Sequence, residues 1–171
     1  MNYPSAHRGF TLIEAIIYLA LFSILMGGAT VAAYYLFDSA TKIGTRTLLQ
    51  EESDFVLGKI DWALSGAKAV TAPAEGTTGS SLTVSKWDTA LGNPVVVARN
   101  GSQVNLTLGS NPPAILNNTN TTVERLTFTH IKGSGDGLVP EAVETVLTLT
   151  AYTPTGATVS RTATSTVYLR H

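Results

Sequence analysis

Apolar, uncharged residues dominate the first part of the chain. Ala15 to Phe37 forms a stretch of 23 residues without a charged side chain, rich in isoleucine, leucine, alanine and phenylalanine. As a helix it would extend roughly 35 Å, which is enough to cross the hydrocarbon core of a bilayer. Tyr34 and Tyr35 stand near its end, where interfacial aromatic residues are expected. The pattern predicts a membrane-spanning helix whose weakest point is Gly27-Gly28.

The helical pattern continues beyond this stretch, but it becomes amphipathic. Apolar residues recur at helical spacing while polar and charged residues occupy the positions between them. These apolar positions are Leu49, Val56, Ile60, Ala63 and Ala67. Since no proline interrupts Phe10 to Ala72, the sequence predicts a single helix of roughly 55 residues, about 80 Å long, that ends near Ser65-Gly66.

From Ala67 onward, short segments alternate between apolar and polar residues, as strands with one buried face do. Asn100-Gly101 between two apolar segments predicts a tight hairpin, and Pro154-Thr155-Gly156 predicts a second turn. The fold class is therefore α+β, with a long N-terminal helix packed on an antiparallel sheet. The predicted strands are Ala67–Thr71, Ser81–Trp87, Val95–Arg99, Gln103–Leu108, Val123–Lys132, Thr145–Thr153 and Ala157–Leu169.

Composition narrows the functional classes. The 171 residues suit one compact domain with an appendage. Only 13% of the residues are charged and the net charge is −1, so no electrostatic footprint favours nucleic acid. The chain has no cysteine, which excludes disulfides, thiolate catalysis and cysteine-type zinc sites.

The junction between the polar N-terminus and the apolar stretch has an unusual sequence. His7-Arg8-Gly9 ends the polar segment, and Phe10-Thr11-Leu12-Ile13-Glu14 opens the apolar one. Gly9 lacks a side chain, so a protease can approach the backbone closely. Glu14 begins the apolar helix, where a carboxylate costs on the order of 2.5–3.5 kcal/mol, and such residues are usually functional.

The string from Arg8 to Glu14 resembles the class III leader junction of type IV prepilins and type II secretion pseudopilins. The resemblance implies that a prepilin peptidase cuts after Gly9 and methylates the new terminus, Phe10, on the cytoplasmic side. It also implies that Glu14 pairs with the Phe10 amino group of a neighbouring subunit. Ala114 to Asn117, Val123 to Phe128 and the C-terminal strand look like strands of minor heads, particularly of the J type. Unlike many major pilins, the chain has no proline within the apolar stretch and no cysteine.

The resemblance implies a structural subunit of a type IV pilus or of a secretion or competence pseudopilus. The absence of cysteine and the atypical head favour a minor subunit, and minor subunits of this family prime assembly or sit near the tip. The expected regions are a cleaved leader (1–9), a membrane or filament-core helix (10–37), its amphipathic continuation (38–66) and an exported head (67–171). The expected location is the bacterial inner membrane and then the filament. Expected partners are prepilin peptidase, other pilin subunits, an inner-membrane assembly platform and membrane lipid, without nucleic acid.

Three alternatives remain open at this point. An ordinary secretory signal cut near Gly28 to Ala33 is disfavoured, because the apolar stretch exceeds the usual 7–15 residues of such signals. A membrane-anchored binding or adhesion module that does not polymerise leaves Glu14 unexplained. A secreted enzyme would need activity from residues 39–171, and we expect no catalytic residue, cofactor or metal there.

Other chemically suggestive residues favour structural roles. His130 lies near Ser134 and Asp136 without a nucleophile motif around it, so a half-buried or surface strand histidine is expected. Asp136 and Glu141 supply two oxygen ligands, fewer than the 6–8 that calcium takes. Trp62 and Trp87 are expected to pack in the core.

Overall fold

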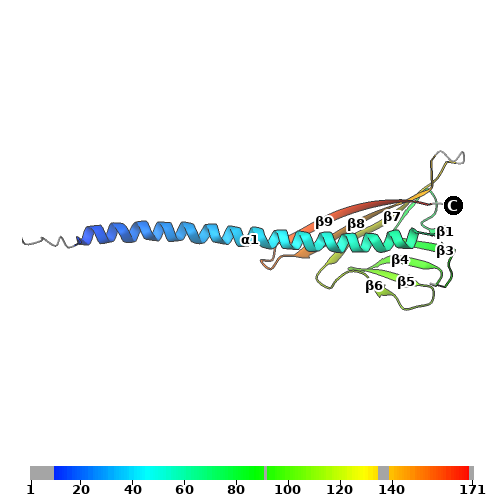
Figure 1. The fold of residues 1–171 in the computed structure, drawn as a ribbon, viewed down its shortest axis with the longest axis horizontal. Helices are drawn as coiled ribbons and strands as arrows, with labels where there is room; N and C mark the ends of the chain where they lie inside the picture. Colours follow the sequence, from blue (N-terminus) through cyan, green and yellow to red (C-terminus); the bar gives the residue numbers. More distant parts are fainter. Residues whose placement is uncertain (1–9, 91, 135–138, 170–171) are drawn as a thin grey trace, which may run out of the picture. The chain divides into compact units, whose positions relative to one another are not determined.

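A computed structural model describes residues 10–90, 92–134 and 139–169. It divides the chain into an N-terminal unit, Met1–Ala40, and a C-terminal unit, Thr41–His171. One helix, α1 (Leu12–Leu64), contributes to both units (Figure 1). The predicted long helix is confirmed, including its passage through Gly27-Gly28 without a break. It ends where the sequence predicts, because Gly66 adopts a φ of 68°, which terminates helices readily.

The strands of the C-terminal unit form two antiparallel sheets. The first sheet has the order β1-β3-β4-β5-β6 and the second has the order β2-β7-β8-β9. The strands are β1 (Ala67–Ala72), β2 (Thr78–Gly79), β3 (Ser81–Lys86), β4 (Val95–Asn100), β5 (Gln103–Leu108), β6 (Ala114–Ile115), β7 (Thr122–Ile131), β8 (Ala142–Tyr152) and β9 (Thr158–Tyr168).

All seven predicted strands occur, and β6 lies where the resemblance to pilin heads indicated a strand. Two features were not predicted. The short strand β2 pairs with β7, and the strands divide into two sheets instead of one. The division follows from pairing: β1 pairs with β3, whereas the longer strands β7, β8 and β9 pair with one another. Alternation along a strand indicates which face is buried but not which strand lies alongside.

Both predicted turns are present, with a small shift in the first. Asn100 pairs with Gln103, so the two loop residues of the β4–β5 hairpin are Gly101 and Ser102. Gly101 has a φ of 60°, the left-handed region that two-residue hairpins favour at their first loop position. In the β8–β9 turn, Gly156 has a φ of 84° and Thr153 N donates to Ala157 O at 2.8 Å.

The core of the C-terminal unit lies between α1 and the two sheets. The buried side of α1 presents residues spaced three or four apart, as the amphipathic pattern predicts. These residues are Thr45, Leu49, Ser53, Val56, Leu57, Ile60, Ala63 and Leu64. The apolar residues among them pack in one cluster with Leu82 and Val97 of the first sheet and with Phe128 and Leu147 of the second. The second half of the helix therefore joins the two sheets into one unit.

Replacing Ile60 by alanine tests this role of the helix. Ile60 is completely buried, so Ile60→Ala removes apolar contacts and leaves a cavity, and we expect a loss of about 2–5 kcal/mol in the free energy of unfolding. Ile43 offers a matched control, because it is the same residue type on the same helix and is 63% exposed. Ile43→Ala should change the stability by less than about 0.5 kcal/mol. Denaturant unfolding of the full chain in detergent measures both; equal effects would contradict the packing described.

Candidate functional site

The N-terminal unit leaves its apolar surface uncovered. From Phe10 to Phe37 every residue is exposed except Glu14, which is half-buried. Large side chains are among the most exposed, including Leu12 at 80% and Ile24 at 74%. Among the described residues, one helix is long and apolar enough to cross a membrane, and it is α1. Apolar surface of this extent needs a covering of lipid or of other helices.

Thr11 caps the exposed N-terminus of α1. Its Oγ1 atom accepts a hydrogen bond from Glu14 N at 3.4 Å, and its carbonyl accepts one from Ala15 N at 3.1 Å. Thr11-Leu12-Ile13-Glu14 has the spacing of a capping box, in which the cap and the glutamate lie three residues apart. Such a cap satisfies backbone donors that would otherwise be left without partners in hydrocarbon. This role of Thr11 was not predicted, although the three-residue spacing of Thr11 and Glu14 indicates it.

Glu14 stands on the same helical face as Phe10 and Tyr18, at intervals of four residues. The Tyr18 hydroxyl donates to Glu14 Oε1 at 3.4 Å, and the rings of Phe10 and Tyr18 meet edge to face with centroids 5.9 Å apart. Within the described part of the chain, no cation pairs with Glu14. The acid is therefore placed on an exposed apolar surface with one weak local partner.

The predicted cleavage site is only partly described. Phe10 is 76% exposed and immediately precedes the capping residue. Gly9 and the rest of the predicted leader lie outside the described residues. Cleavage after Gly9 and methylation of Phe10 therefore stay predictions.

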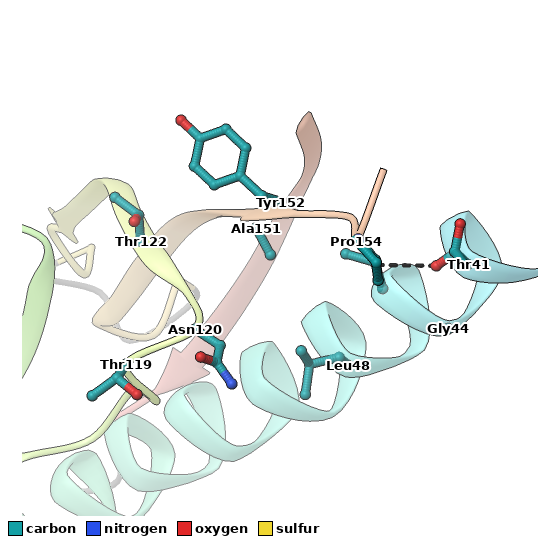
Figure 2. Close-up of a pocket in the computed structure, with 10 residues that line it drawn as sticks. Thr41, Gly44, Leu48, Thr119, Asn120, Thr122, Ala151, Tyr152 and Pro154 are labelled. Carbon is teal, nitrogen blue, oxygen red and sulfur yellow. Dashed lines mark hydrogen bonds between the residues drawn. The ribbon is translucent and has the colours of Figure 1, made fainter. Parts of the chain in front are cut away.

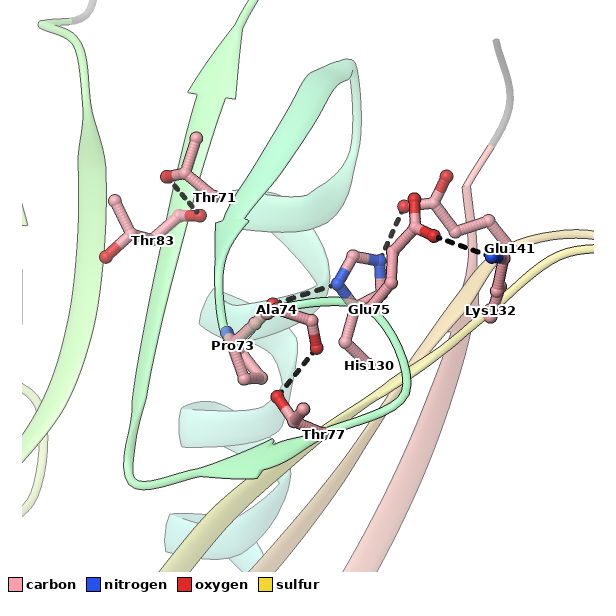
Figure 3. Close-up of polar contacts among 9 residues, drawn as sticks. All are labelled: Thr71, Pro73, Ala74, Glu75, Thr77, Thr83, His130, Lys132 and Glu141. Atoms are coloured by element: carbon pink, nitrogen blue, oxygen red, sulfur yellow. Dashed lines mark hydrogen bonds and ion pairs between the residues drawn. The ribbon is translucent and has the colours of Figure 1, made fainter.

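His130 differs from its prediction, because it is fully buried in the C-terminal unit. Only 2% of its surface is exposed. Its Nδ1 atom donates to Pro73 O at 2.9 Å, and Nε2 lies 2.6 Å from Glu141 Oε1 (Figure 3). The prediction of a half-buried or surface histidine is wrong because the chain between β1 and β2 covers the end of β7, where Gly76 N also donates to His130 O. The ring ties this connection to the residue that precedes β8.

Glu141 is thereby engaged with His130 and is not free to act as a calcium ligand with Asp136. Asp136 itself lies outside the described residues. Among the residues that are described, no group of three or more histidine, cysteine, aspartate or glutamate side chains is arranged to hold a metal ion. The polar contacts around His130 thus support a structural role.

Trp62 and Trp87 were expected to pack in the core, and this prediction is wrong. Trp87 is 69% exposed and Trp62 is 37% exposed. The alternation of β3 explains this outcome, because Leu82, Val84 and Lys86 point inward and Trp87 follows on the opposite face. Lys86 Nζ donates to Trp62 O at 2.7 Å and lies 4.0 Å from the centroid of the Trp62 ring. Burial lowers the pKa of the Lys86 ammonium, while the charge of Asp88 acts in the opposite direction.

A surface pocket of about 670 Å³ lies between the second half of α1 and two loops of the C-terminal unit. Figure 2 shows Leu48 and Gly44 of the helix opposite Asn120 and Pro154. None of the lining residues carries a charge. Its polar lining groups are threonine and tyrosine hydroxyls and the amide of Asn120.

One comparison with known proteins gave a result. Residues 4–30 match the family model of the prokaryotic N-terminal methylation motif. The chain therefore carries a type IV pilin-like prepilin motif, which indicates prepilin-type processing. The match includes the junction and most of the apolar stretch but none of the C-terminal unit. No curated protein and no solved structure gave a significant match to the chain.

The contact between buried His130 and half-buried Glu141 leads to a prediction about stability. His130→Leu removes the ring nitrogens that contact Glu141 Oε1 and Pro73 O, so we expect a loss of about 2–4 kcal/mol in the free energy of unfolding. Adding Glu141→Leu removes the second polar group and should restore part of that loss.

The exposed pair of Lys132 and Glu75, whose charged atoms are 3.8 Å apart, provides the control. Lys132→Met should change the stability by no more than about 1 kcal/mol. Denaturant unfolding of the full chain measures all three variants. A loss for His130→Leu no greater than that for Lys132→Met would disprove the stabilising role of the His130–Glu141 contact.

Proposed function

We propose that this chain is a structural subunit of a type IV pilus or of a type II secretion or competence pseudopilus, most consistent with a minor one. The single observation that carries the proposal is Glu14, an acid at the start of a continuous apolar surface and within a matched prepilin motif. A plain anchor has no use for a carboxylate there, whereas a bundle of such helices can pair it with a cation.

The proposed sequence of events begins with processing. Prepilin peptidase cuts between Gly9 and Phe10 and methylates the new amino group, which keeps its positive charge. Residues 10–37 then anchor the chain in the inner membrane, and the amphipathic continuation (38–66) and the head (67–171) face outward. Membrane anchoring by the apolar helix is what the motif and the exposed surface of α1 support.

Assembly follows from two physical requirements. The exposed apolar side chains of residues 10–37 exchange lipid for the helices of other subunits, so that van der Waals contacts are kept throughout. The Glu14 carboxylate meets the Phe10 amino group of a neighbour, and this pair is strong in a medium of low dielectric constant and costly to break. The pair sets the register of the incoming subunit.

We also propose two partners that drive assembly, a separate ATPase and an inner-membrane assembly platform. The chain has no phosphate-binding loop motif, so these partners supply the work of extraction. The motif family is structural, and we accordingly propose no enzymatic activity for the head. The competing candidate, an anchored adhesion module, needs neither Glu14 nor polymerisation.

Substitution of Glu14 separates these two candidates. For a filament subunit, Glu14→Ala should yield a processed chain that stays in the membrane, with incorporation into filaments reduced at least about tenfold, since a broken buried pair costs several kcal/mol. Glu14→Gln should reduce incorporation to a similar extent, because it removes the negative charge. It keeps a side-chain oxygen at the helix terminus, so the effect reports on the charge. Quantitative immunoblotting of sheared filaments against membranes measures the distribution.

Glu51 provides a control acid on the exposed side of the same helix. Glu51→Gln should leave incorporation close to the native level. Normal incorporation of both Glu14 variants would rule out the filament mechanism and favour the anchored module.

A further inference from the structure

The proposed function creates a problem for the subunit before assembly. While it waits in the membrane, Glu14 has not yet met the amino group of another subunit, and a carboxylate with few partners at the edge of hydrocarbon is costly. Residues 15–37 contain five hydroxyl-bearing side chains that could relieve this cost, namely Tyr18, Ser23, Thr30, Tyr34 and Tyr35.

Four of these five hydroxyl-bearing residues are occupied elsewhere or remote. Ser23 donates back to Leu19 O and Thr30 donates back to Met26 O, each at 2.8 Å. Tyr34 and Tyr35 pack their rings against each other and lie five helical turns or more from Glu14. Tyr18 is the remaining candidate, and its hydroxyl already points to Glu14 Oε1.

The geometry around Tyr18 suits a temporary partner. The interval of four residues brings side chains together on one helical face, and the edge-to-face contact with Phe10 supports the tyrosine ring from the N-terminal side. The oxygen atoms are 3.4 Å apart, which is long for an O–H···O bond. A hydrogen bond of this length is weaker than an ion pair, so an arriving ammonium group can displace it.

We propose that Tyr18 is a positioning residue that holds the Glu14 carboxylate in the unassembled subunit and releases it to the amino group of a neighbour. This inference rests on the proposed function, because it concerns the same acid. The hydroxyl lowers the cost of keeping Glu14 charged in the membrane, and the ring of Phe10 keeps that hydroxyl on the face where the neighbour arrives.

Tyr18→Phe tests the proposal, since it removes the hydroxyl and keeps the ring. The measurement is the ratio of inserted to non-inserted full chain, obtained by alkaline extraction after cell-free synthesis with inner-membrane vesicles. We expect Tyr18→Phe to lower this ratio roughly three- to tenfold, the effect of an ordinary hydrogen bond, because the 3.4 Å length makes this bond weak despite the charge of its acceptor. Tyr35→Phe is the matched control on the same apolar stretch, and it should leave the ratio unchanged.

The same substitution in a Glu14→Gln background distinguishes positioning from general packing. If Tyr18 acts through the charge of Glu14, Tyr18→Phe should have almost no effect in that background, because the two substitutions remove one interaction. An equal loss in both backgrounds, or an effect no larger than that of Tyr35→Phe, would overturn the inference.

The two proposals fail in different ways. Filaments that form normally with Glu14→Gln would refute the proposed function. A block of assembly by Glu14→Gln together with a silent Tyr18→Phe would refute only the role of Tyr18.

Discussion

The apolar surface that α1 leaves uncovered governs the rest of the structure. A helix that exposes almost every residue from Phe10 to Phe37 is unfavourable in water, so this part of the chain must exist in lipid or among similar helices. The second half of the same helix needs no such covering, because the two sheets of its own chain bury its apolar residues. The apolar surface of the second half of α1 is thus buried within the chain, whereas the apolar surface of the first half stays exposed.

The few polar groups on this exposed apolar surface need hydrogen-bond partners, because lipid and apolar helices supply none. Thr11 supplies a cap where water is unable to satisfy the helix terminus, and Tyr18 supplies a donor to Glu14. Neither contact neutralises the carboxylate. The N-terminal turn therefore combines a capped backbone amide with a carboxylate that has one weak hydrogen bond, and the proposed pairing with a neighbour rests on this combination. In the C-terminal unit, by contrast, the buried polar residue His130 has partners at both ring nitrogens.

Local patterns in the sequence predicted the elements well. The apolar stretch, the amphipathic spacing from Leu49 to Ala63 and the alternation of the strands each depend on residues close in the chain, and α1 and seven strands follow from them. What depends on distant residues was missed. The pairing that separates β1 and β3 from β7, β8 and β9 is not encoded in alternation, and His130 is buried by a connection 57 residues away in the chain. Glu14 was recognised because its charge interrupts an apolar pattern, whereas the contacts of Thr11 and Tyr18 required the helix itself.

The central claim is that the mature chain begins with a charged, methylated Phe10 opposite a membrane acid. The most direct test is mass spectrometry of the N-terminal peptide of the full chain isolated from membranes of cells that contain prepilin peptidase. The account predicts a peptide that starts at Phe10 and carries the added mass of one methyl group. A chain that still starts at Met1, or one that starts near residue 30 after ordinary signal cleavage, would contradict it.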